Sequence, residues 1–231
     1  MVPDARPING SLWGAWVRGG ADRWEVVRRS WGIFTRNTTE LMDLLNRPTT
    51  NPALALTLMG DDLEATEPFW GEFDQRLHNH LASAVSLVDH ARRLTSYYEA
   101  DAPTTVADYK MRNATIVEMK EAAFLRDLRN YLLHYGAPPI IQTLSFGGGG
   151  RVARHEIKLS SQRLLEWTAW NAPARAYLSS FGDRDGPVLG RDVAAYSNAM
   201  SALFTWLFNQ RRLVSDPANV PSRFRINPPT Q

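Results

Sequence analysis

The stretch FLRDLRNYLLHYGAPP, residues 124–139, determines how the rest of the chain is interpreted. Its apolar residues recur at helical spacing and predict one buried face: Leu125, Leu128, Leu132 and Tyr135. Gly136 suits the left-handed position just past a helix. Pro138 and Pro139 cannot continue a helix, because proline lacks an amide proton and has a fixed φ. The stretch therefore predicts the last turns and the end of a helix.

The opposite face of this helix is polar. At about 100° per residue, Arg126, Asp127, Asn130 and His134 fall on one arc, and Arg129 lies at its border. Asn130 stands one turn before His134 and can orient it through a hydrogen bond. Arg129 and His134 are about 140° apart around the axis, so they cannot easily touch on one helix. Two copies of the helix crossing face to face would bring an Arg and a His from each into one cleft.

Residues 129–134, with the sequence RNYLLH, resemble the Arg-x4–6-His signature of the HEPN superfamily. Asn130 matches the polar residue that often follows the Arg in that signature. HEPN domains are small α-helical bundles, and many are metal-independent endoribonucleases of toxin–antitoxin, anti-phage and CRISPR-associated systems. The surrounding helices extend the resemblance to residues 62–136. It implies a homodimer whose active site forms between two copies of the motif helix.

The resemblance implies catalytic roles for Arg129, His134 and Asn130. Arg129 would hold the scissile phosphate and stabilise the transition state, His134 would transfer a proton, and Asn130 would support His134. The 2′-hydroxyl of RNA would attack the adjacent phosphate and leave a 2′,3′-cyclic phosphate, with no cofactor and no metal. Four further residues are expected to bind RNA or support the site: Arg126, Tyr135, His90 and Arg93.

Each of these residues also has a structural interpretation. His134 could cap the carbonyls at the end of its helix, and Arg129 could pair with a nearby carboxylate in solvent. His90 and Arg93 could belong to a solvated helix face. The main functional alternative is a non-catalytic helical-bundle adaptor that only binds a partner. A third is one component of a defence system that an antitoxin or another regulatory protein keeps silent.

The composition is that of a globular chain: 231 residues, 44% hydrophobic and 22% charged. The net charge is +2, so RNA contacts must come from local groups of Arg rather than from bulk charge. The absence of cysteine excludes disulfides, thiol catalysis and thiolate metal sites. The sequence shows neither a secretory signal nor an apolar run of about 18 residues, so we expect a cytoplasmic protein that does not contact a membrane.

The first half of the chain predicts an irregular leader over 1–20, a helix from Asp22 and a loop at 46–52. The longest helix is expected over about 69–98. The next, over about 106–135 with a break near 113–114, would be its antiparallel neighbour. Some polar residues at helix starts are expected to be caps: Asp61, Asp62, Thr104 and Thr105. His78 and His80 point about 200° apart on a helix and are predicted to lie on its surface.

The second half changes its periodicity. Alternating residues on either side of a run of glycines predict a β-hairpin over 140–159. No Lys-Ser or Lys-Thr pair and no helix follow the glycines, so they are interpreted as a turn rather than a phosphate loop. Helices follow over 160–213, the first capped by Ser160 or Ser161 and kinked at Pro173, and a Pro-rich tail covers 214–231. We expect all of these segments to form one mainly α-helical domain over 1–231.

Overall fold

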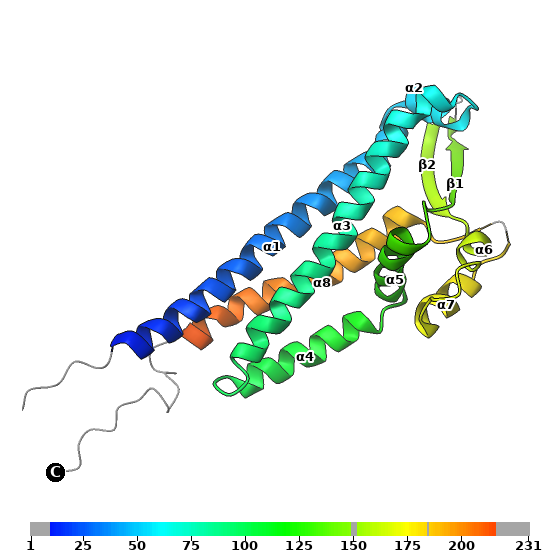
Figure 1. The fold of residues 1–231 in the computed structure, drawn as a ribbon. Coiled ribbons are helices and arrows are strands. Elements are labelled where there is room, and N and C mark those ends of the chain that lie inside the picture. Colours follow the sequence, from blue (N-terminus) through cyan, green and yellow to red (C-terminus); the bar gives the residue numbers. More distant parts are fainter. Residues whose placement is uncertain (1–9, 149–151, 184, 216–231) are drawn as a thin grey trace, which may run out of the picture.

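The chain is mainly helical and carries one two-stranded antiparallel sheet, as predicted (Figure 1). The computed structural model describes residues 10–148, 152–183 and 185–215. In chain order the elements are α1 (Gly10–Thr50), α2 (Pro52–Met59), α3 (Leu63–Tyr97), α4 (Pro103–Val117), α5 (Lys120–His134), β1 (Ile140–Phe146), β2 (Val152–Leu159), α6 (Ser161–Leu164), α7 (Ala172–Ser179) and α8 (Leu189–Ser215). The hairpin, α6 and α7 gather at one end of the molecule (Figure 1).

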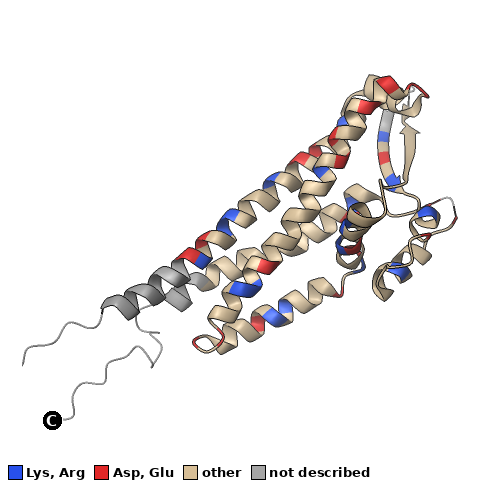
Figure 2. Ribbon diagram, viewed as in Figure 1, with Lys and Arg blue, Asp and Glu red and all other residues tan. Residues whose placement is uncertain are grey.

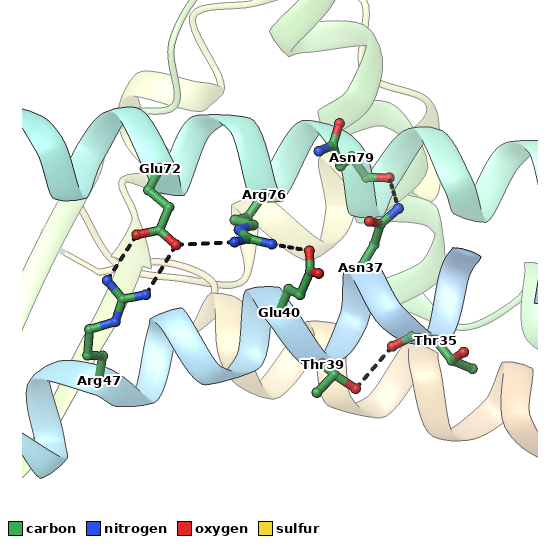
Figure 3. Close-up of polar contacts among 8 residues, drawn as sticks. All are labelled: Thr35, Asn37, Thr39, Glu40, Arg47, Glu72, Arg76 and Asn79. Atoms are coloured by element: carbon green, nitrogen blue, oxygen red, sulfur yellow. Dashed lines mark hydrogen bonds and ion pairs between the residues drawn. The ribbon is translucent and has the colours of Figure 1, made fainter. Parts of the chain in front are cut away.

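α1 and α3 pack against each other as a long antiparallel pair (Figure 1). Large side chains at helical spacing on both helices are fully buried: Val27, Phe34, Leu41 and Leu44 on α1, and Phe73, Leu77, Leu87 and Leu94 on α3. Burying each such side chain contributes about 1.5–3 kcal/mol. Polar side chains also pair across this seam. Arg47 contacts Glu72, Arg76 contacts Glu40, and Asn37 donates to the carbonyl of Asn79 (Figure 3).

α1 is longer than the sequence predicted. It already runs at Gly10 and continues to Thr50, so both the irregular leader over 10–20 and the loop at 46–50 are wrong, while residues 1–9 lie outside the described chain. Pro48 is tolerated near the helix end because contacts hold the residues just before it: Leu44 and Leu45 are buried, and Arg47 is paired with Glu72. Only Asn51 separates α1 from α2, and its side chain caps α2.

The segment after α3 does not fold back along α3. α4 packs chiefly on α8, where Val106, Tyr109 and Ile116 join one hydrophobic cluster with Leu203 and Leu207. The helices of the predicted neighbour, α4 and α5, do contact α3, but the main packing partner of α3 is α1. The predicted break also moves, because α4 ends at Val117 and α5 begins at Lys120.

The helix caps agree only in part with the sequence. Asp62 caps α3 by accepting from the amide of Ala65 at 3.0 Å, and Ser160 caps α6, both as predicted. The predicted caps Thr104 and Thr105 are wrong. α4 begins at Pro103, because proline at a first helical position needs no capping acceptor for an amide proton.

The predicted β-hairpin is confirmed. Ile140 pairs with Leu159 and Leu144 with His155, and the register shifts once, between Ser145 and Phe146. Gly149 and Gly150 of the predicted turn lie outside the described residues. The hairpin covers the end of α1, where the hydroxyl of Thr49 accepts from the amide of His155 at 3.1 Å.

The C-terminal region breaks where one helix was expected. α6 ends at Leu164, and Pro173 opens a separate helix, α7, instead of kinking one helix. Tyr177 on α7 donates its hydroxyl to the buried carboxylate of Asp192 on α8 at 3.0 Å, which ties the two helices together. Burial raises the pKa of Asp192 to about 6. α8 is described to Ser215, and the rest of the predicted tail lies outside the described residues.

Candidate functional site on the outer face of α5

The inner face of α5 is fixed by aromatic packing. The rings of Phe124 and Tyr131 stack on Trp170 with centroid distances of 6.0 and 5.8 Å. Leu125 and Leu128 are fully buried in the same core. The inner stripe of the sequence thus anchors the helix, and its rotation about its axis is fixed by these contacts. The opposite face must point away from the core.

The outer face of α5 carries the predicted motif. His134 is exposed, Arg129 and Asn130 are half-buried, and Leu133 between them is 45% exposed. Within the described parts of the chain, no hydrogen bond or ion pair joins Arg129, Asn130 or His134 to another residue. The expected hydrogen bond from Asn130 to His134 is therefore not formed. All three side chains are free to meet an external group.

Asp127 does not belong to this open face, although the sequence placed it on the same arc. It is buried, and its Oδ2 accepts from the amide of Asn171 at 2.6 Å. Asn171 in turn caps α7 by accepting from the amide of Ala174 at 2.9 Å. Asp127 thus holds the start of α7 against α5, which is a structural role.

The end of α5 differs from the prediction in detail. Tyr135 occupies the C-cap position, and its amide donates to the carbonyl of Tyr131 at 2.8 Å. Gly136 does not adopt a left-handed conformation, and a Cβ there would meet nothing. Tyr135 is 53% exposed, and the centroid of its ring lies 5.0 Å from that of Tyr131. One face of the Tyr135 ring is therefore available to stack with another group.

His90 and Arg93 lie on α3, away from the motif on α5 of the same chain. Both line a cavity of about 760 Å³ between α1 and α3, together with Arg92 and Tyr97, and no residue of the 129–134 motif lines it. Nδ1 of His90 is 2.6 Å from the hydroxyl of Ser30, whose own proton goes to the carbonyl of Val26. The structure does not bring these two residues together with Arg129 and His134.

Arg126 lies on α5 near the motif and also lines a cavity. Its guanidinium is exposed on α5 beside the motif, and its side chain also lines a second cavity, between α3, α4, α5 and α8. Over the described helices α1 and α3, basic and acidic residues are interspersed (Figure 2). Attraction of a nucleic acid to α5 would therefore depend on Arg126 and Arg129 themselves.

Two features of the structure were not predicted from the sequence. His80, predicted to lie on the surface, is fully buried, with Nδ1 3.1 Å from the hydroxyl of Thr38 and its ring beside Phe34. Burial lowers its pKa to about 4. The second feature is Leu133, which is exposed on the motif face and was not among the residues assigned to the buried stripe.

Among residues 10–148, 152–183 and 185–215, no group of three or more His, Asp or Glu side chains is arranged to hold a metal ion. None of the described helices has the length and apolarity of a bilayer-spanning segment.

Comparison with known proteins adds no relative. No protein-family model, curated protein or solved structure matches this chain. The likeness of residues 129–134 to the HEPN signature therefore rests on those residues and on the helix that carries them.

Proposed function

We propose that this protein is a metal-independent endoribonuclease of HEPN type. The observation that carries the proposal is the outer face of α5, where Arg129, Asn130 and His134 are accessible and have no partner among the described residues. Polar side chains that stabilise a fold are normally paired, as Asp127 is with Asn171. Unpaired Arg and His side chains around an exposed Leu133 are better suited to bind something outside the chain.

The active site we propose forms between two copies of the protein. On one helix Arg129 and His134 point about 140° apart, so a single copy does not direct both at one phosphate. Two α5 helices packed through Leu133 would place Arg129 of one copy near His134 of the other. A symmetric homodimer does this twice with one surface, which is the commonest arrangement of soluble oligomers.

The chemistry follows from the two side chains. The 2′-hydroxyl of the substrate attacks the adjacent phosphorus, so the O2′–P bond forms and the P–O5′ bond breaks. The hydroxyl loses a proton and the leaving 5′ oxygen gains one, and His134 transfers the proton. Arg129 donates hydrogen bonds to the phosphate oxygens as their charge grows. The products are a 2′,3′-cyclic phosphate and a 5′-hydroxyl.

The test is an RNA cleavage assay in EDTA with purified protein. Wild type should cleave transfer RNA and messenger RNA into fragments with cyclic phosphate ends and leave the all-2′-deoxy strand intact. Arg129→Ala and His134→Ala should each lower the rate by about 10²–10⁴-fold. Matched controls are Arg36→Ala and His78→Ala, which remove exposed residues of the same types elsewhere and should keep full activity. Equal cleavage by all five proteins would contradict the proposal.

A second candidate is supported by the apolar residues at the end of α5. Leu133 and Tyr135 are 45% and 53% exposed, which also suits a helical adaptor that binds a protein partner there. An antitoxin or regulatory protein seated on this face would block a nuclease as well. The adaptor predicts that neither Arg129→Ala nor His134→Ala changes any RNA, whereas Leu133→Glu abolishes partner binding.

A further inference from the structure

Arg126, which precedes the motif on α5, also lines a second cavity. It measures about 240 Å³ and opens where α3, α4, α5 and α8 meet. Figure 1 shows α3 and α4 diverging from their connecting turn, with α5 and α8 closing the space between them. None of Arg129, Asn130 and His134 lines it, so the inference drawn from it does not depend on the proposed nuclease.

The wall of this cavity is mainly apolar. Its hydrocarbon lining comes from all four helices: Leu81, Val85, Val88, Ile116, Leu125 and Met200. The volume is a little below the range of about 300–1,000 Å³ that is usual for drug-sized ligands. A ligand filling it would be small and would present an apolar body to this wall.

Tyr196 contributes a polar group to the lining. Tyr196 packs its ring edge-to-face on Phe34, and among the described residues its hydroxyl makes no hydrogen bond. Burial raises the pKa of Tyr196 to about 12, and the nearby guanidinium of Arg126 acts in the opposite direction. The hydroxyl is therefore neutral near pH 7 and can donate a hydrogen bond in the neighbourhood of a positive charge.

Arg126 makes one long ion pair among the described residues, with Asp127. Arg92 and Asp89, both in the lining, form an ion pair at 3.0 Å and cancel each other. The Asp127 carboxylate lies 4.0 Å from Nε of Arg126 and already accepts from the amide of Asn171, so the guanidinium keeps donors for another group. A guanidinium with unused donors and a hydroxyl without a hydrogen bond among the described residues, both beside an apolar wall, complement a small amphipathic anion.

We propose that this cavity binds a short-chain carboxylate. Its carboxylate would accept hydrogen bonds from Arg126 and from the hydroxyl of Tyr196, and its hydrocarbon chain would lie against Val85, Val88 and Ile116. Because α3, α4, α5 and α8 all contribute to the lining, the bound ligand would hold these four helices together.

The test is calorimetric titration of the full chain with hexanoate and octanoate. 1-Hexanol and hexylammonium, which have the same number of carbons as hexanoate, serve as uncharged and cationic probes. The carboxylates should bind and raise the melting temperature, while the alcohol and the ammonium ion should bind at least tenfold more weakly. Tyr196→Phe and Arg126→Gln should each weaken octanoate at least tenfold. Arg93→Gln, in the other cavity, should leave its affinity unchanged.

A filling variant provides an independent check. Val88→Phe places a larger apolar side chain in the cavity and should abolish octanoate binding while the circular dichroism spectrum stays that of the wild type. Failure of every carboxylate to bind at millimolar concentration would overturn the proposal. So would equal binding of carboxylate, alcohol and ammonium ion, or unchanged affinity in both Tyr196→Phe and Val88→Phe. RNA cleavage is a separate readout, so either proposal can fail without the other.

Discussion

The seam between α1 and α3 and the outer face of α5 use the same residue types in opposite ways. In the seam, His80 forms a hydrogen bond with Thr38, and His90 forms one with Ser30. The guanidinium of Arg47 donates to both carboxylate oxygens of Glu72 (Figure 3). On α5, Arg129 and His134 form no hydrogen bond or ion pair with a described residue. A polar residue on a helix is structural when a neighbouring element supplies its partner. It is a candidate for function when the fold leaves it accessible and unpaired.

The two histidines make this comparison testable. His80→Ala removes a fully buried ring and its hydrogen bond with Thr38, and should lower the free energy of unfolding by about 3 kcal/mol. His134→Ala should change it by less than about 0.5 kcal/mol, because the side chain is exposed and unpaired. Urea denaturation of both variants measures the two values. A cost for His134→Ala as large as that for His80→Ala would remove the distinction.

The pH dependence of stability sharpens the role of His80. Its pKa is about 4 in the folded chain against an ordinary value of 6.5, because burial disfavours the charged ring. The unfolded chain therefore binds a proton that the folded chain does not. The contribution of neutral His80 to the free energy of unfolding is fully present above pH 6.5. It should fall by at most about 3 kcal/mol as the pH drops to 4.

The control for this titration is His80→Phe, which keeps a ring beside Phe34 but cannot be protonated. Other groups, including Asp192, titrate in both proteins and cancel in the difference between their unfolding curves. That difference should depend on pH only between about 4 and 6.5. A difference that is constant with pH would show that His80 is not kept neutral by burial.

Substitutions of Asp127 test whether this residue is structural or belongs to the outer face of α5. Asp127→Ala leaves the amide of Asn171 without its acceptor and should cost about 2 kcal/mol of unfolding free energy. Asp127→Asn keeps an acceptor oxygen and should cost less than half as much. Neither should lower RNA cleavage per folded molecule, measured at a temperature where both variants are folded. Loss of cleavage in a fully folded Asp127→Asn protein would place Asp127 within the active site after all.

The smallest effect is expected at the exposed end of the seam. Arg47 and Glu72 are both partly exposed, so solvent screens their attraction and Glu72→Gln should cost only about 0.2–1 kcal/mol. The pKa of Glu72 is lowered chiefly by its hydrogen bonds from Arg47, so the cost should shrink as the pH falls through the titration of this carboxyl group. It should also shrink in high salt. A salt-independent cost of several kcal/mol would mean that this pair is shielded from water.

Local patterns in the sequence predicted the parts of the fold that depend on neighbouring residues. The β-hairpin, the cap at Asp62 and the end of α5 follow from alternation, hydrogen-bonding side chains and prolines close by. The partner of α3 did not follow, because a short link between helices does not fix which helix packs on which. The extension of α1 through Pro48 depends on contacts with α3 that no local rule contains.

In the candidate site, too, the features set by neighbouring residues were predicted, and those set by distant parts of the chain were not. The helical period correctly placed Arg129 and His134 away from the buried stripe, since that requires only one helix. It failed for Asp127, whose partner lies 44 positions later in the chain, and for His80, whose partner lies 42 positions earlier. The cavity beside Tyr196 could not be predicted, because four helices contribute its lining.

Mixing two inactive variants tests the shared cleft most directly. Arg129→Ala keeps His134, and His134→Ala keeps Arg129, so a dimer containing one of each has one complete Arg and His pair across its interface. The two proteins would be unfolded together, refolded and assayed on RNA in EDTA beside each variant treated alone. We predict that the mixture regains cleavage that neither variant shows. A mixture as inactive as its components, alongside an active refolded wild type, would contradict an active site built from two copies of α5.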